Sequence, residues 1–111
     1  MLKKPSKSWR YEHVTLDRVI DGDTIDVIID VGFRFTTRQR LRLLELDTPE
    51  RGEPLWREAT DRLRALVTDQ PLTVTTVKQD SFGRWLAHVE VNGQDVSALM
   101  RDWLRMVADG V

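Results

Sequence analysis

The chain has 111 residues, which fits one domain, and its 41% hydrophobic and 32% charged residues are typical of a folded globular protein rather than a disordered chain. It contains no cysteine, so disulfides, thiolate metal ligands and cysteine nucleophiles are excluded, and its chemistry must use oxygen and nitrogen groups. The formal net charge of −1 argues against a strong non-specific nucleic-acid binder, although lysines and one arginine make the amino terminus basic.

The first residues carry positive charge without a following apolar stretch, so the sequence shows neither a signal peptide nor a membrane span. We therefore expect a cytoplasmic protein, unless a leader has already been removed. We expect residues 1–10 to be a basic N-terminal tail, for which disorder is one option. Residues 11–111 are then expected to form a single domain.

The first part of the chain predicts three strands. Tyr11–Val19 and Thr24–Asp30 are rich in β-branched and aromatic residues, and Asp21-Gly22-Asp23 between them is a turn signal. Residues 38–44 follow the two-residue period of a strand, which places three arginines on one face: Arg38, Arg40 and Arg42.

The second part predicts a helix, two strands and a further helix. After Pro54, apolar residues recur at steps of three and four, which indicates an amphipathic helix. Leu72–Lys78 and Arg84–Val91 are strand-like, and a last helix should begin near Asp95, which can cap it. This order is the layout of a mainly β (α+β) fold, a five-stranded Greek-key barrel of the OB type with two helices.

Three clusters hold residue types suited to phosphate chemistry: Asp21–Thr24, Arg42–Glu50 and Asp80–Arg84. Each is weak alone, because Asp-Gly-Asp is most often a hairpin turn and Gly-Arg can be a turn before a surface charge. Together, carboxylates that follow strand ends can meet at one rim of a barrel and offer the oxygen ligands that a hard divalent cation prefers. Arginines near the same rim supply planar donor forks for phosphate oxygens.

In combination these motifs resemble those of the staphylococcal nuclease (thermonuclease) family, from about Val14 to about Val107. The matching segments are Val19–Thr24, Arg42–Leu44, Asp47–Glu50, Phe82–Arg84 and Leu86-Ala87. The resemblance implies a calcium-dependent nuclease that hydrolyses phosphodiester bonds of DNA, RNA or both by in-line attack of water. Its partner is then a nucleic acid.

The resemblance also implies a site for one Ca²⁺. The carboxylates of Asp23 and Asp47 and the main-chain carbonyl of Thr48 match the family's ligands. Asp21 matches an acid one step further out, which orients waters or neighbouring ligands.

Three further residues match the family's catalytic groups. Glu50 corresponds to the acid proposed as general base, a role debated against simple positioning of the water. Arg42 and Arg84 correspond to the pair that grips the scissile phosphate, and Arg84 is also placed to help the departing oxygen. Two guanidinium groups would stabilise the negative charge that develops during attack.

The sequence departs from the family near its end. Members commonly continue past the second helix with tyrosines that stack on the nucleotide and with a third helix, whereas this sequence stops at Val111 and has no tyrosine after Tyr11. Phe82 stands where the family has an aromatic residue beside the nucleotide, so we expect some substrate stacking to survive. Arg38 and Arg40 either extend the phosphate-binding surface or form the solvated face of a strand.

Two alternatives follow from these departures. A catalytically weak or silent module that binds nucleic acid or protein would fit the missing stacking segment, although such modules are expected to lose the acids or arginines that this chain keeps. The apolar last helix, with Trp103 and Met106, could also dock on a second copy of the chain as a homo-oligomer.

Overall fold

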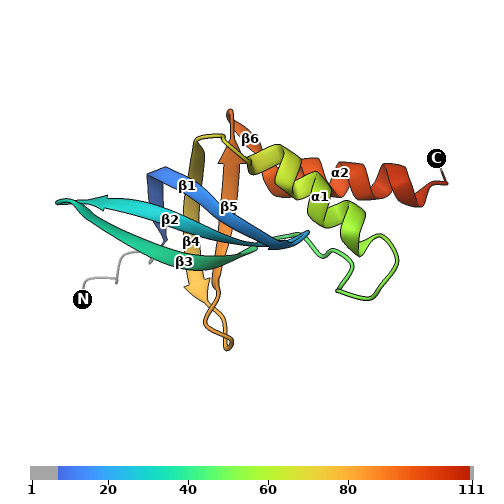
Figure 1. The fold of residues 1–111 in the computed structure, drawn as a ribbon, viewed down its shortest axis with the longest axis horizontal. Coiled ribbons are helices and arrows are strands. Elements are labelled where there is room, and N and C mark those ends of the chain that lie inside the picture. Colours follow the sequence, from blue (N-terminus) through green and yellow to red (C-terminus); the bar gives the residue numbers. More distant parts are fainter. Residues whose placement is uncertain (1–7, 111) are drawn as a thin grey trace, which may run out of the picture.

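The structure, a computed structural model, describes residues 8–110. Figure 1 shows a set of long twisted strands with both helices gathered at one end. In chain order the elements are β1 (Trp9–Asp21), β2 (Thr24–Gly32), β3 (Phe35–Leu43), α1 (Trp56–Val67), β4 (Leu72–Gln79), β5 (Trp85–Val91), β6 (Gln94–Asp95) and α2 (Val96–Ala108).

Strands β1 to β5 form a closed barrel. Antiparallel neighbours follow the order β3-β2-β1-β4-β5, and a parallel pairing of β3 with β5, from Leu41 opposite Trp85 to Leu43 opposite Ala87, joins the two ends. This confirms the predicted mainly β fold with a five-stranded barrel and two helices. The two-residue strand β6 was not predicted, and it pairs with β5 through a turn at Asn92-Gly93.

The β2–β3 hairpin is longer than the sequence predicts. Its ladder continues to the pair Gly32 and Phe35, and the turn residues Phe33 and Arg34 have positive φ angles of 55° and 63°. Tight hairpin turns need this backbone conformation, but it is usually supplied by Asn or Gly, so Phe-Arg gave no signal.

The first strand also begins earlier than predicted, at Trp9 instead of Tyr11. Trp9 and Arg10, which the sequence placed in the basic tail, therefore belong to β1 and pair with β4. Residues 1–7 of that tail lie outside the described residues.

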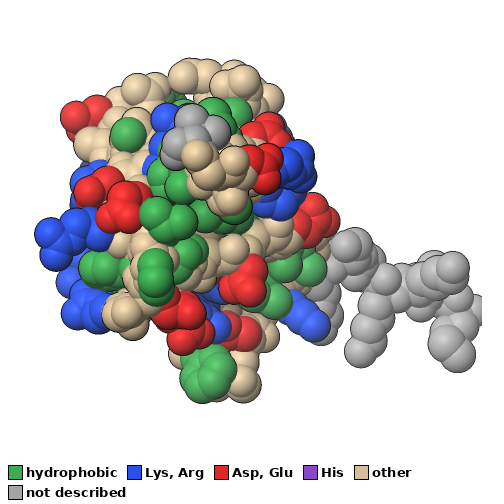
Figure 2. Space-filling view, turned by 90° about the vertical axis from the view of Figure 1, so that its right-hand side faces the viewer, with side chains coloured by type: hydrophobic (Ala, Val, Ile, Leu, Met, Phe, Trp, Pro, Cys, Tyr) green, Lys and Arg blue, Asp and Glu red, His purple; other side chains and the backbone are tan. Residues whose placement is uncertain are grey.

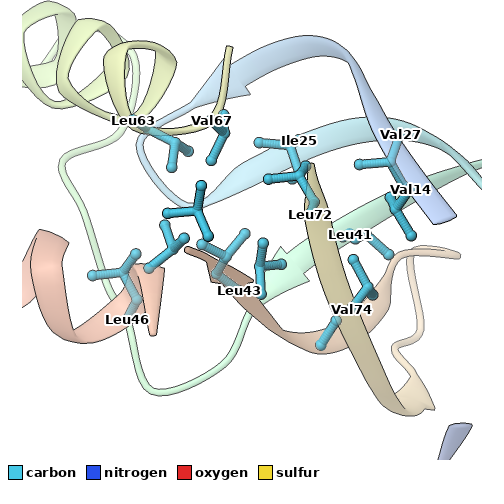
Figure 3. Close-up of a cluster of buried hydrophobic side chains, with 14 of the residues drawn as sticks. Val14, Ile25, Val27, Leu41, Leu43, Leu46, Leu63, Val67, Leu72 and Val74 are labelled. Atoms are coloured by element: carbon cyan, nitrogen blue, oxygen red, sulfur yellow. The ribbon is translucent and has the colours of Figure 1, made fainter. Parts of the chain in front are cut away.

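Buried apolar side chains fill the barrel and the space beneath α1. Figure 3 shows Leu63 and Val67 of α1 near Ile25 of β2, with Leu43 of β3 facing the same interior. Each of these side chains is at most 1% exposed. Burial of one such side chain is worth about 1.5 to 3 kcal/mol, so this core holds the strand ends and α1 in a fixed relation.

Helix α2 begins where the sequence predicts, with Asp95 as its N-cap, because the Asp95 side chain accepts a hydrogen bond from the Ser97 amide. Trp103 packs against the core, whereas Met106 is exposed. The predicted docking of a second copy on this helix stays a prediction. Within residues 8–110, no helix is long and apolar enough to cross a membrane.

Candidate active site

A polar pocket of about 390 Å³ lies where the β1–β2 turn meets the loop after β3 (Figure 1). Its lining consists of Asp21, Asp23, Arg42, Asp47, Thr48, Pro49, Glu50 and Arg84. The structure thus brings together every residue to which the resemblance gives a metal-binding or catalytic role. These roles themselves stay predictions. The lining has four carboxylates and two guanidinium groups, an excess of negative charge suited to a cation.

The excess of negative charge in the pocket does not extend over the neighbouring surface. Figure 2 shows acidic and basic side chains interspersed over the face at the helix end of the molecule. This distribution agrees with the formal net charge of −1 for the chain. A strong non-specific binder of nucleic acid would carry a broad basic surface, which this face does not show (Figure 2).

The β1–β2 turn is positioned by the absence of a side chain at Gly22. A Cβ atom there would lie 2.8 Å from Oγ1 of Thr48 and 3.0 Å from Cβ of Ala59. Glycine therefore lets the turn pack directly on the β3–α1 loop and on α1. This close approach brings Asp21 and Asp23 to Thr48.

Asp23 is the most connected acid of the pocket. Its Oδ1 accepts a hydrogen bond from Oγ1 of Thr24 (3.0 Å), and its Oδ2 accepts one from the Thr48 amide (3.2 Å). Burial opposes its ionisation, but hydrogen bonding with Asp21, the charge of Arg42 and the Thr48 amide together lower its pKa. Burial and the neighbouring Asp23 raise the pKa of Asp21. Asp23 therefore loses its proton at lower pH than Asp21 does.

Arg42 ties the loop after β3 to the pocket. Its Nη1 donates to the main-chain carbonyls of Leu43 (2.7 Å) and Leu46 (2.6 Å). Its Nη2 lies 3.3 Å from Oδ2 of Asp23 and 3.7 Å from Oδ1 of Asp47. The guanidinium group therefore has a structural task as well as a place in the pocket.

Asp80 holds Arg84, the second guanidinium group. Nε of Arg84 donates to Oδ2 of Asp80 at 2.8 Å, while Oδ1 of Asp80 accepts from the amides of Phe82 and Arg84, both at 2.9 Å. The Arg84 guanidinium lies 5.5 Å from the centre of the Phe82 ring, which is 82% exposed. The β4–β5 turn thus presents an arginine in the pocket and an open aromatic surface beside it.

The other two acids stand at the solvent side. The Asp47 side chain is 99% exposed, and Glu50 is exposed as well. The loop that carries them is anchored from α2, because Nη1 of Arg101 donates to the carbonyl of Glu45 at 2.7 Å. Asp47 and Glu50 can therefore meet a ligand without displacing core residues.

The donor set fits a calcium ion in its chemistry. Within residues 8–110, no group of three His, Cys, Asp or Glu side chains is placed to hold a metal. The predicted ligand set is different, because it has only two carboxylates and adds a main-chain carbonyl. Ca²⁺ can fill its remaining coordination positions with water. Oγ1 of Thr48 is buried against Gly22 and meets no hydrogen-bond partner among the described residues.

Arg40, predicted to bind substrate, does not line this pocket. Its Nε and Nη2 donate to Oδ1 and Oδ2 of Asp26, at 2.8 and 3.1 Å, on the outward face of the barrel. The sequence analysis missed Asp26. The pairing of β2 with β3 sets Asp26 opposite Arg40, so an assumed hairpin register was the signal that could have found it.

The sequence is similar to those of known proteins. A sequence profile described as Staphylococcal nuclease homologue matches residues 40–104, more than half of the chain. The chain belongs to the staphylococcal nuclease family.

Relatives of this family member include an uncharacterized endonuclease of Escherichia coli O157:H7, 35% identical over 79% of this chain and 55% of that protein. Endonuclease YncB of Bacillus subtilis (strain 168) is 37% identical over 86% of this chain and 48% of its own length. Thermonuclease of Staphylococcus hyicus is 39% identical over 65% of this chain and 44% of its own length. The chain thus spans about half the length of the relatives it matches.

Proposed function

We propose that this chain is a calcium-dependent nuclease that hydrolyses phosphodiester bonds of DNA, RNA or both. The proposal depends on a single observation: one pocket combines four carboxylates with two guanidinium groups. Anionic groups can bind a divalent cation, and guanidinium groups match phosphate oxygens, so the pocket has what a phosphodiester and a metal ion require. Relatives that are named endonuclease or thermonuclease support the same activity.

In this proposal one Ca²⁺ is held by the carboxylates of Asp23 and Asp47 and the main-chain carbonyl of Thr48. When bound, the ion would orient the phosphate and withdraw electron density from it. The lowered pKa of Asp23 keeps that carboxylate charged and ready to bind a cation. Asp21 hydrogen-bonds with the Asp23 amide at 3.3 Å and so keeps the turn in position.

Hydrolysis needs a base for the attacking water and donors for the charge that develops on phosphorus oxygens. Glu50 would take a proton from the attacking water as the water oxygen bonds to phosphorus. The bond from phosphorus to the leaving oxygen breaks, and that oxygen takes a proton from solvent. Arg42 and Arg84 would stabilise the added negative charge. Asp80 positions Arg84 for this task before substrate arrives, because its carboxylate fixes the Nε side of the guanidinium group.

A second candidate function is a module that binds nucleic acid without cutting it. The observation in its favour is that both arginines already serve the protein: Arg42 donates to two carbonyls, and Arg84 is paired with Asp80. Fewer donors are then left for a transition state. The two candidates share a ligand and differ in turnover, so a cleavage assay separates them.

The assay incubates the purified chain with single-stranded DNA, duplex DNA and RNA, in Ca²⁺ or in chelator, beside Glu50→Gln and Arg84→Ala. Arg64→Ala is the control, because Arg64 pairs with Asp61 on α1 and is not part of the pocket lining. We expect cleavage that requires Ca²⁺, survives in the control and is lost in both site variants. Intact substrates with retained binding would instead establish the binding module. A cytoplasmic location stays a prediction, which cell fractionation would check.

A further inference from the structure

A cluster of arginines surrounds one buried acid on the outward face of β1, β2 and β3. Arg18 donates through Nε to Oδ2 of Asp26 at 3.0 Å, and Arg40 grips both carboxylate oxygens. Nη2 of Arg38 lies 3.7 Å from the same Oδ2 and also pairs with Asp17. We call Arg18, Arg38 and Arg40 the arginine cluster.

The cluster keeps a positive charge and free donors. The Asp26 side chain is only 6% exposed, whereas those of Arg18 and Arg38 are each 59% exposed. Asp26 and Asp17 cannot neutralise three guanidinium groups, so one positive charge remains. Each guanidinium group has five N–H donors, and Asp26 occupies at most two of those of Arg40. The remaining donors are held in place at the surface.

The arginine cluster continues from the pocket along β3. Arg42 stands opposite Thr24 in the β2–β3 ladder, Arg40 opposite Asp26 and Arg38 opposite Ile28. Alternate residues on a strand are about 6.8 Å apart and share a face, a spacing comparable to that of successive phosphates on a nucleic-acid strand. The hydrogen bonds that Arg40 donates to Asp26 and, to a lesser degree, the charge of Asp21 raise the pKa of Arg40, which agrees with its place beside the acidic pocket.

The surface beside Ile28, the residue opposite Arg38, is acidic. The hollow there is lined by the acids Glu12, Asp30 and Asp69, together with Thr36 and Ile28. A phosphate would be repelled there. The arginine cluster therefore has room for one or two phosphates beyond the pocket.

We propose that the arginine cluster binds the phosphates of a nucleic-acid strand on one side of the bond held in the pocket. This inference rests on the proposed function, because the pocket defines where the strand begins. The contacts are to phosphates, so they add affinity and position without base preference. Asp26 is a positioning residue that fixes the three guanidinium groups.

Binding is measured in chelator, so that no cleavage occurs, with a short fluorescent oligothymidylate over a range of salt concentrations. The test variants are Arg38→Gln and the double variant Arg18→Gln with Arg38→Gln. The matched control is Arg64→Gln with Arg105→Gln, two exposed arginines of α1 and α2 that pair with Asp61 and Asp102. Arg38→Gln leaves Asp26 bonded to Arg18 and Arg40, so it keeps the fold, which thermal unfolding verifies.

We expect the salt slope of log K to become shallower by about 0.7 for each lost phosphate contact, up to about 1.4 in the double variant. The control should keep the slope of the unaltered chain. Equal slopes in the cluster variants and the control, or no binding by the unaltered chain, would overturn the inference. Failure of the unaltered chain to cut any substrate would instead count against the proposed function alone.

Discussion

Arg42 and Asp23 form an ion pair in the candidate site, with Nη2 of the arginine 3.3 Å from Oδ2 of the aspartate. The same guanidinium group donates to the carbonyls of Leu43 and Leu46, so it connects Asp23 to the loop after β3. Its removal would leave the carboxylate of Asp23 without its ion-pair partner and two main-chain carbonyls without their donor. Arg42 is thus expected to stabilise the fold in addition to the catalytic role proposed for it.

Arg42→Gln should therefore lower both stability and cleavage. Hydrogen bonds to charged groups are worth about 1.5 to 3 kcal/mol each, so we expect a loss of several kcal/mol in the free energy of unfolding. Arg84→Gln, at the end of an exposed turn, should reduce cleavage with a much smaller effect on stability. Urea unfolding followed by circular dichroism measures the stability of both variants. Equal stability of the two variants would contradict the structural task assigned to Arg42.

Gly22→Ala should disturb the pocket from the opposite side. The added Cβ would approach Oγ1 of Thr48 to 2.8 Å and Cβ of Ala59 to 3.0 Å, so the turn must move away from the loop and from α1. Overpacking of this kind costs about 1 to 3 kcal/mol. Gly93→Ala is a useful comparison, because nothing lies within 4 Å of its Cβ and only its φ of 76° is strained. Thermal unfolding should show both losses, but only Gly22→Ala should also weaken cleavage.

The residues of the pocket could be predicted from the sequence because their motifs sit at strand ends and in turns, where a closed barrel brings distant segments to one rim. The acids that pair with the arginines could not be predicted from the sequence. Asp26 meets Arg40 only when the β2–β3 register is known, and the turn that sets it, Phe33-Arg34, has no turn signature. Asp80 stood in a recognised motif, but its grip on Arg84 depends on the conformation of the β4–β5 turn. The sequence motifs thus predicted which residues line the pocket. Only the tertiary structure shows which arginine side chains are already paired with acids.

The ionisation of Asp26 should make the stability of the protein depend on pH. Hydrogen bonds from Arg40, assisted by Arg18 and opposed by burial, lower the pKa of Asp26 below its usual value of 3.8. A group with a lowered pKa in the folded state stabilises fully above its unfolded pKa, and this contribution is lost as pH falls through the folded value. At neutral pH we expect Asp26→Asn to be less stable by about 2 kcal/mol, since charged hydrogen bonds are replaced by neutral ones.

This difference between the unaltered chain and Asp26→Asn should shrink once the pH falls below about 4. Urea unfolding of both proteins between neutral and acidic pH measures it. The acids of the pocket titrate in both proteins, so their contribution cancels in the comparison. A difference that stays constant down to the acid transition would show that the charge of Asp26 does not stabilise the fold.

Calcium should stabilise the folded chain if the pocket holds the ion. A ligand that binds only the folded state adds about 2.7 kcal/mol at a hundred times its dissociation constant, so the melting temperature should rise with Ca²⁺ and fall back with chelator. Asp47→Asn is the sharpest variant, because this side chain is 99% exposed and its replacement should not change stability in chelator. We expect it to weaken the calcium-dependent rise, whereas Asp102→Asn on α2 should leave the rise intact. If Asp47→Asn responds to Ca²⁺ like the unaltered chain, Asp47 is not a ligand and the ion, if bound, lies elsewhere.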